Sequence, residues 1–160
     1  MIALGCDHGG YELMQEVKAF LDKKGYEYVD FGCYGPASVD YPEYARKVAY
    51  AILDGKCDKG ILICGTGIGI SIAANKIPGI RAALCTDCFC AQATREHNDS
   101  NILAMGGRVV GGGLATKIVE TFLETPFSND ERHIRRINLM EAKEILTIQS
   151  DFSNGSELLL

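Results

Sequence analysis

The sequence has no tryptophan, only 4 prolines and 3 histidines among its 160 residues, and no long apolar run. Its longest stretch without a charged residue covers positions 60–75 and is interrupted by glycines, whereas a membrane-spanning helix needs roughly 18 to 20 apolar residues. No basic residue precedes Lys18, so no positively charged segment opens the chain as it would in a secretory signal. We therefore expect a cytoplasmic protein with no transmembrane helix.

Positive charge is also sparse. The 16 Lys and Arg residues stand against 21 Asp and Glu residues, which gives a formal charge of -5, and no basic block occurs. This balance argues against a nucleic-acid-binding surface. With 47% hydrophobic residues and 18 glycines, the chain has the composition of one soluble globular domain and is too short for two.

The seven cysteines are an odd number, which favours reduced thiols over a disulfide framework. Cys85 and Cys88 form a CxxC motif that Cys90 follows closely. No second CxxC and no compact histidine pair supplies the remaining ligands of a structural zinc site. We expect no metal, and the CxxC leaves a thiol redox function as a weak alternative.

Short apolar runs alternate with segments of helical period along the whole chain. This alternation predicts one single three-layer α/β/α Rossmann-like domain with a five-stranded parallel sheet and about five helices. The domain should cover residues 1–149, with 150–160 as a loosely ordered C-terminal tail. Asp87 is placed to cap the helix that runs toward His97. The expected strands are 2–6, 26–31, 60–64, 80–85 and 102–105.

Polar residues follow several of these strands, where ligands bind in such sheets. They come after the first and third strands and at the end of the helix that follows the fourth. We expect all of them to converge on one edge of the sheet. They are Asp7, His8, Cys64, Thr66, His97 and Asn98.

The loop at 65–69 has the pattern GxGxG and leads into a helix that should start near Ile70. It lacks the glycine spacing of a dinucleotide-binding loop and the Gly-Lys-Ser/Thr of a Walker loop. Its amides can turn toward one anion, although a tight strand-to-helix turn would look the same. Cys64 directly precedes these amides, which would favour the thiolate of a base or nucleophile. A buried packing cysteine is the alternative.

Near the C-terminus, Arg132, His133 and Arg136 lie on one face of a helix expected from Asn129 onward. This face could bind a phosphate group or could simply be solvated. If it binds phosphate, the helix has to reach across to the strand ends, on its own subunit or on a neighbouring one.

Five segments together resemble the RpiB/LacAB sugar-phosphate isomerase family, and within it the type B ribose-5-phosphate isomerases. The resemblance covers about residues 1–146 and is silent on the tail. The segments are GCDHG at 5–9, DYP at 40–42, GILICGTGIGISIAANK at 60–76, REHN at 95–98 and GRVVG at 107–111.

The resemblance implies interconversion of D-ribose 5-phosphate and D-ribulose 5-phosphate through a cis-enediol, with no metal and no cofactor. Cys64 would be the base that moves a proton between C2 and C1. Some members have a Glu base just after the glycine loop, where this chain has Ile70. Thr66 would assist at the substrate oxygens. The loop amides that would hold the enediolate are those of Gly65, Thr66, Gly67, Ile68 and Gly69.

The same resemblance implies the remaining roles. His97 would open the furanose ring, and Asp7 would bind the sugar hydroxyls or relay protons there. Tyr41 and Asn98 would line the sugar. The implied partner is a second copy in a homodimer, and pairing of dimers into tetramers is left open. The phosphate ligands would be His8, Arg108, Arg132 and Arg136, the last two supplied across the subunit interface.

Two further functions are open. The same enediol chemistry on a six-carbon substrate, allose 6-phosphate or galactose 6-phosphate, needs only a longer pocket. A non-catalytic phosphosugar sensor is the second, because a fold alone does not confer activity.

Overall fold

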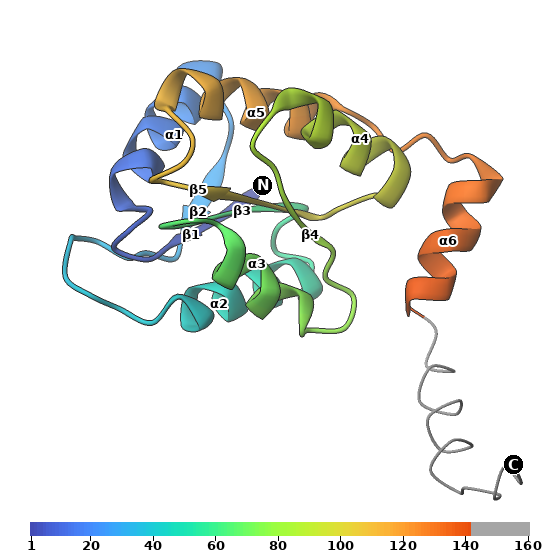
Figure 1. Ribbon diagram of the computed structural model, residues 1–160, viewed down its shortest axis with the longest axis horizontal. Helices are drawn as coiled ribbons and strands as arrows, with labels where there is room; N and C mark the ends of the chain where they lie inside the picture. Colours follow the sequence, from blue (N-terminus) through green and yellow to red (C-terminus); the bar gives the residue numbers. More distant parts are fainter. Residues whose placement is uncertain (142–160) are drawn as a thin grey trace, which may run out of the picture. The chain divides into compact units, whose positions relative to one another are not determined.

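The structure is a computed structural model that describes residues 1–141 (Figure 1). Its five-stranded sheet is parallel throughout, in the order β2-β1-β3-β5-β4, which confirms the expected fold class. The strands are β1 (Ile2–Cys6), β2 (Tyr28–Asp30), β3 (Lys59–Cys64), β4 (Ala82–Leu84) and β5 (Ile102–Gly106). The helices are α1 (Tyr11–Lys24), α2 (Tyr41–Leu53), α3 (Ile68–Asn75), α4 (Cys88–Asn98), α5 (Gly112–Glu124) and α6 (Glu131–Glu141).

The chain forms two compact units. The first spans Met1–Ser128 and contains the whole sheet with α1 to α5, and the second begins at Asn129 and contains α6. The expected tail at 150–160 and the expected domain boundary at 149 lie outside the described residues. No helix within 1–141 is long and apolar enough to cross a membrane.

In the first unit, helices cover both faces of the sheet (Figure 1). On one face α1, α4 and α5 pack over a core that includes Leu4, Ile63 and Phe122. On the other face α2 and α3 pack over a smaller core that includes Leu62 and Ile102. Strands β1 and β5 are buried along their full length, and β3 is buried from Gly60 onward, as a parallel sheet covered on both sides requires.

The connections from β1 create the functional crevice. The chain passes from β1 through α1 to β2 on one side, then through α2 to β3 on the other side of β1. Because α1 and α2 lie on opposite faces, the carboxyl ends of β1 and β3 open onto a gap between the two layers. This is the topological switch point at which ligands bind in open α/β sheets.

Several element boundaries differ from the expected ones. The edge strands β2 and β4 have only 3 residues each, and each pairs with its single neighbour through these three positions. Helix α3 begins at Ile68, earlier than expected. The cap at Asp87 is confirmed, because its Oδ1 accepts the Cys90 N–H at 2.7 Å. Six helices form within the described residues, one more than expected.

Candidate active site

The loops that follow β1, β3 and β5 meet at the crevice through contacts between glycines. A Cβ added to Gly107 would lie 2.4 Å from the Gly9 carbonyl oxygen, and one added to Gly106 would lie 2.7 Å from the Thr66 backbone. A Cβ on Gly9 would approach the Gly65 backbone to 3.0 Å. Only glycine permits this approach, which brings the three loops together.

Cys64 is buried at the end of β3. Its Sγ accepts the backbone N–H of Gly67 at 3.1 Å, and the Ile68 N–H bonds to the Thr66 Oγ1 at 3.3 Å. The amides of Gly65 and Thr66 meet no acceptor within residues 1–141. The sulfur thus lies beside the start of α3, with two N–H groups close by that remain available to a bound oxyanion.

Asp7 is buried directly after β1. Its Oδ1 accepts two backbone N–H groups, from Gly9 at 2.8 Å and from Gly10 at 3.1 Å. These two hydrogen bonds hold the carboxylate in place, and both are made to the same oxygen, Oδ1. Oδ2 has no hydrogen-bond partner in the described part of the chain, so it can serve a sugar hydroxyl.

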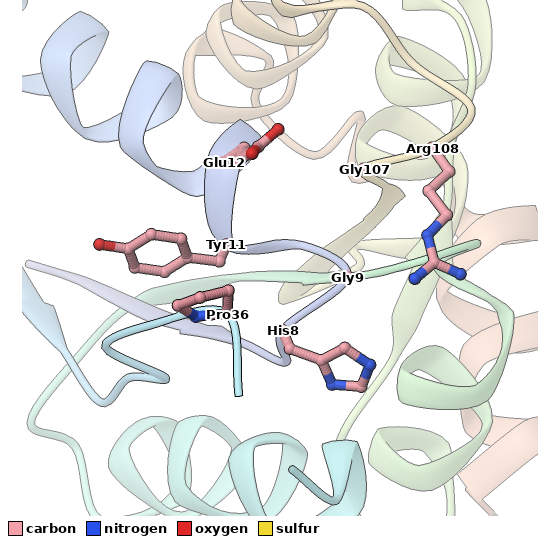
Figure 2. Close-up of a pocket in the computed structure, with 7 residues that line it drawn as sticks. All are labelled: His8, Gly9, Tyr11, Glu12, Pro36, Gly107 and Arg108. Carbon is pink, nitrogen blue, oxygen red and sulfur yellow. The ribbon is translucent and has the colours of Figure 1, made fainter. Parts of the chain in front are cut away.

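His8 and Arg108 line a pocket of about 360 Å³ (Figure 2). The Val39 N–H donates to His8 Nδ1 at 3.2 Å, so the proton of the neutral imidazole is on Nε2. In Figure 2 the imidazole and the guanidinium lie at the same end of the pocket, which is the arrangement that suits a bound phosphate. The other lining residues are Gly9, Tyr11, Glu12, Pro36 and Gly107.

Tyr41 lies beside the glycine loop. It is the first residue of α2, and a Cβ added to Gly69 would lie 2.7 Å from the Cζ atom of its ring. Arg108 lies near the start of the loop, because a Cβ on Gly65 would lie 3.4 Å from its Nη1. The glycine loop is therefore flanked by an aromatic side chain and by a guanidinium group.

His97 and Asn98 do not join this cluster, and the expectation that they converge with it in one chain is wrong. Helix α4 starts at the carboxyl end of the sheet and runs back, so its last turn lies at the amino end. The Asn98 carbonyl accepts the Nε–H of Arg81 at 2.8 Å, and Arg81 directly precedes the first residue of β4. The nearby Asn101 carbonyl accepts the N–H of Gly60, near the start of β3, at 2.8 Å. Helical periodicity correctly identified the helix. The error lay in placing its last turn at the carboxyl edge of the sheet, where only its first turn lies.

Arg132 and Arg136 lie in the second unit, one turn apart on α6, and both are exposed. Arg132 Nη2 forms an ion pair with Asp130 Oδ2 at 3.4 Å. Their expected role as phosphate ligands stays a prediction.

The cysteines near the start of α4 show little sign of redox chemistry. Burial raises the pKa of Cys85 to about 12, and a hydrogen bond with the Asp87 carboxylate raises the pKa of the Cys90 thiol. A thiol with a raised pKa forms little thiolate at neutral pH and is a poor nucleophile. Within residues 1–141, no group of three or more His, Cys, Asp or Glu side chains is arranged to hold a metal ion.

Known proteins are similar to this chain in both sequence and fold. Residues 2–140 match the family described as Ribose/Galactose Isomerase. The chain belongs to the ribose/galactose isomerase family. Ribose-5-phosphate isomerase B of Escherichia coli (strain K12) is 49% identical over 143 residues, which cover 89% of this chain and 95% of that protein.

A solved structure of another family member, ribose-5-phosphate isomerase B from Clostridium thermocellum, is 55% identical, with a TM-score of 0.87 over 92% of this chain and 98% of that one. The family also includes a galactose-6-phosphate isomerase subunit, LacB, of Clostridium acetobutylicum, which is 38% identical over 79% of this chain and 73% of that protein. This member of the ribose/galactose isomerase family is thus similar to proteins named for a five-carbon and for a six-carbon sugar phosphate.

Proposed function

We propose that this sugar-phosphate isomerase interconverts D-ribose 5-phosphate and D-ribulose 5-phosphate. The observation that carries the proposal is the position of Cys64, whose sulfur accepts an N–H bond from Gly67 in the same glycine-packed crevice as His8 and Arg108. A base beside a site suited to a phosphate dianion is what proton transfer on a small phosphosugar requires. The ribose-5-phosphate isomerases B at 49% and 55% identity favour the pentose over a hexose.

In the proposed mechanism the Cys64 thiolate removes the proton from C2 of the open-chain aldose. The electron pair of the C2–H bond forms the C1–C2 double bond, and O1 takes the charge of the enediolate. The amides of Gly65 and Thr66 donate to this oxygen as the charge develops, where such donors contribute most. The Cys64 thiol then returns the proton to C1, while the hydroxyl proton moves from O2 to O1 with the help of the Thr66 hydroxyl.

The phosphate group would bind where His8 Nε2–H and the Arg108 guanidinium lie at one end of the pocket. Arg132 and Arg136 would complete the phosphate site from a second copy of the chain. Two further guanidinium groups would add bidentate hydrogen-bond donors for the phosphate oxygens.

A second copy is also the source that we propose for His97 and Asn98. Since His97 lies at the opposite edge of its own sheet, it can open the furanose ring only in the site of a partner subunit. A twofold-symmetric homodimer makes this exchange reciprocal, so that each subunit completes the site of the other. Exposed apolar side chains next to the glycine loop, Ile68 and Ile72 on α3, give such a dimer an adjacent surface to bury.

The test is turnover by the purified protein in excess chelator, with ribose 5-phosphate, allose 6-phosphate and galactose 6-phosphate run in parallel. We expect fast conversion of the pentose. Turnover of a hexose phosphate alone would retain the chemistry and reverse the substrate assignment, in line with the LacB relative. Binding of phosphosugars with no turnover at any pH would favour a sensor instead.

A further inference from the structure

The residue that ends helix α4 has an unusual backbone conformation. Asp99 follows His97 and Asn98 and has φ 45° and ψ 45°, in the left-handed region. Residues other than glycine enter this region at a cost, and they stay there only when their surroundings hold them. The contacts that hold Asp99 therefore also determine where the last turn of α4 points.

Two arginines hold Asp99 from different elements. Arg95 Nη1 donates to Asp99 Oδ1 at 2.8 Å, and Arg81 Nη2 lies 3.5 Å from Oδ2. Arg81 also donates to two backbone carbonyls of the turn, from Nε to Asn98 at 2.8 Å and from Nη2 to Asp99 at 2.9 Å. The final carbonyls of a helix lack partners within the helix, and Arg81 satisfies that of Asn98 together with that of the cap residue Asp99.

Arg81 is itself anchored to the sheet. Its N–H donates to Asn101 Oδ1 at 2.9 Å, and its carbonyl accepts the N–H groups of Asn101 and Ile102. Arg95 has a different character, because it is buried, donates to the Ser100 carbonyl at 2.6 Å and lies over the Phe122 ring. Arg95 is thus part of the core, whereas Arg81 links the beginning of β4 to the end of α4.

We propose that Arg81 is a positioning residue for ring opening. Its three contacts with Asn98 and Asp99 fix the last turn of α4, so that the exposed His97 side chain is presented to a second copy of the chain in one orientation. This inference rests on the proposed function and deepens it. Catalytic groups have to be held within roughly 0.5 Å of their productive positions, and a fraying helix end does not provide that.

The two substrates distinguish a loss of ring opening from general damage to the active site, because only one of them has a ring to open. Ribose 5-phosphate is mainly a furanose and must be opened before its C2 proton can be removed. Ribulose 5-phosphate cannot close into a furanose, because its O5 carries the phosphate. Exchange of its C1 proton with solvent therefore needs Cys64 and the loop amides, but no ring opening.

The experiment compares the full-length Arg81→Gln protein with Arg46→Gln, the same substitution at an exposed arginine of α2. For Arg81→Gln we expect kcat on ribose 5-phosphate to fall about tenfold, with KM and deuterium exchange at C1 of ribulose 5-phosphate within about twofold of the unsubstituted protein. Arg81→Lys should recover part of the loss, since an ammonium group can still reach one carbonyl. Arg46→Gln should change none of these quantities.

A second comparison tests whether Arg81 acts through His97. In a His97→Gln background, Arg81→Gln should cause no further loss of kcat, whereas independent effects would multiply. If Arg81→Gln lowers the yield of folded protein, Asp99→Asn is the second variant, because asparagine tolerates the left-handed conformation. Asp99→Asn should also lower kcat on ribose 5-phosphate while KM and deuterium exchange stay nearly unchanged, but the loss of kcat should be smaller.

Proton exchange that falls in parallel with turnover, or losses that multiply with those of His97→Gln, would overturn the positioning role. Unchanged kcat in Arg81→Gln would do the same. If the unsubstituted protein neither turns over a sugar phosphate nor exchanges its protons, the proposed function fails and this inference fails with it.

Discussion

The backbone N–H of Gly67 points at the Sγ of Cys64 across 3.1 Å. Gly67 can do so because its φ is 78°, which turns the loop sharply before α3 begins. A hydrogen bond from an N–H group stabilises a negatively charged sulfur. The turn therefore links the geometry of the loop directly to the proposed base.

Replacing Gly67 by alanine should damage both the fold and the chemistry. The new Cβ would meet Leu84 Cδ1 at 2.5 Å and the Met105 carbonyl carbon at 2.7 Å, in a left-handed conformation. We expect the free energy of unfolding to fall by about 1–3 kcal/mol, and kcat to fall at least about tenfold as the N–H leaves the sulfur. Urea unfolding and steady-state kinetics measure the two effects.

Gly113→Ala is the matched control, since a Cβ there meets nothing within 4 Å and lies in helix α5. It should leave both quantities unchanged or raise stability slightly. Equal behaviour of the two variants would contradict the role assigned to the turn.

Cys64→Ala should remove the proposed base and leave the phosphate site intact. We expect kcat to fall by about a thousandfold or more, while inorganic phosphate still binds with an affinity within about twofold of the original, because His8 and Arg108 are unchanged. Kinetics and isothermal titration measure these quantities. Cys90→Ala, at an exposed cysteine, is the control. Full turnover in Cys64→Ala would eliminate the cysteine mechanism.

The parts of the site that could be predicted from the sequence are those fixed by a single strand end. Cys64 and Asp7 each follow a continuous apolar run, so the strand pattern placed both at the carboxyl edge of the sheet. The bond from Val39 to His8 joins residues 31 positions apart, and no local pattern indicates such a pairing between loops. His97 was misplaced because periodicity identifies a helix without saying which of its ends faces the ligand.

Two buried thiols outside the site, those of Cys6 and Cys85, should react slowly with alkylating reagents, because burial raises the pKa of each. Burial raises the pKa of Cys85 to about 12, and burial next to Cys33 also raises the pKa of Cys6. A raised thiol pKa means that the protonated, unreactive form persists as the pH rises, so at pH 9 only about 0.1% of Cys85 would be thiolate.

We therefore expect iodoacetamide to leave Cys6 and Cys85 unmodified in the native protein at both pH 7.5 and pH 9. Peptide mass spectrometry gives the modified fraction at each position. The unfolded protein in urea is the control, in which all cysteines should react. If Cys85 were modified in the native protein as fast as in urea, its burial in solution would differ from that in the structure.

The proposed sharing of the active site between subunits predicts a specific result when two inactive chains are combined. In a dimer of one Cys64→Ala chain and one His97→Ala chain, one site receives both substitutions and the other receives neither. Random pairing of equal amounts makes about half of the dimers mixed, each with one intact site, so co-expression should restore about a quarter of full activity. The measurement is kcat per chain after co-expression, with each variant expressed alone as a control. If His97 served its own subunit, every site would carry one of the two substitutions, and the mixture would stay as inactive as its parents.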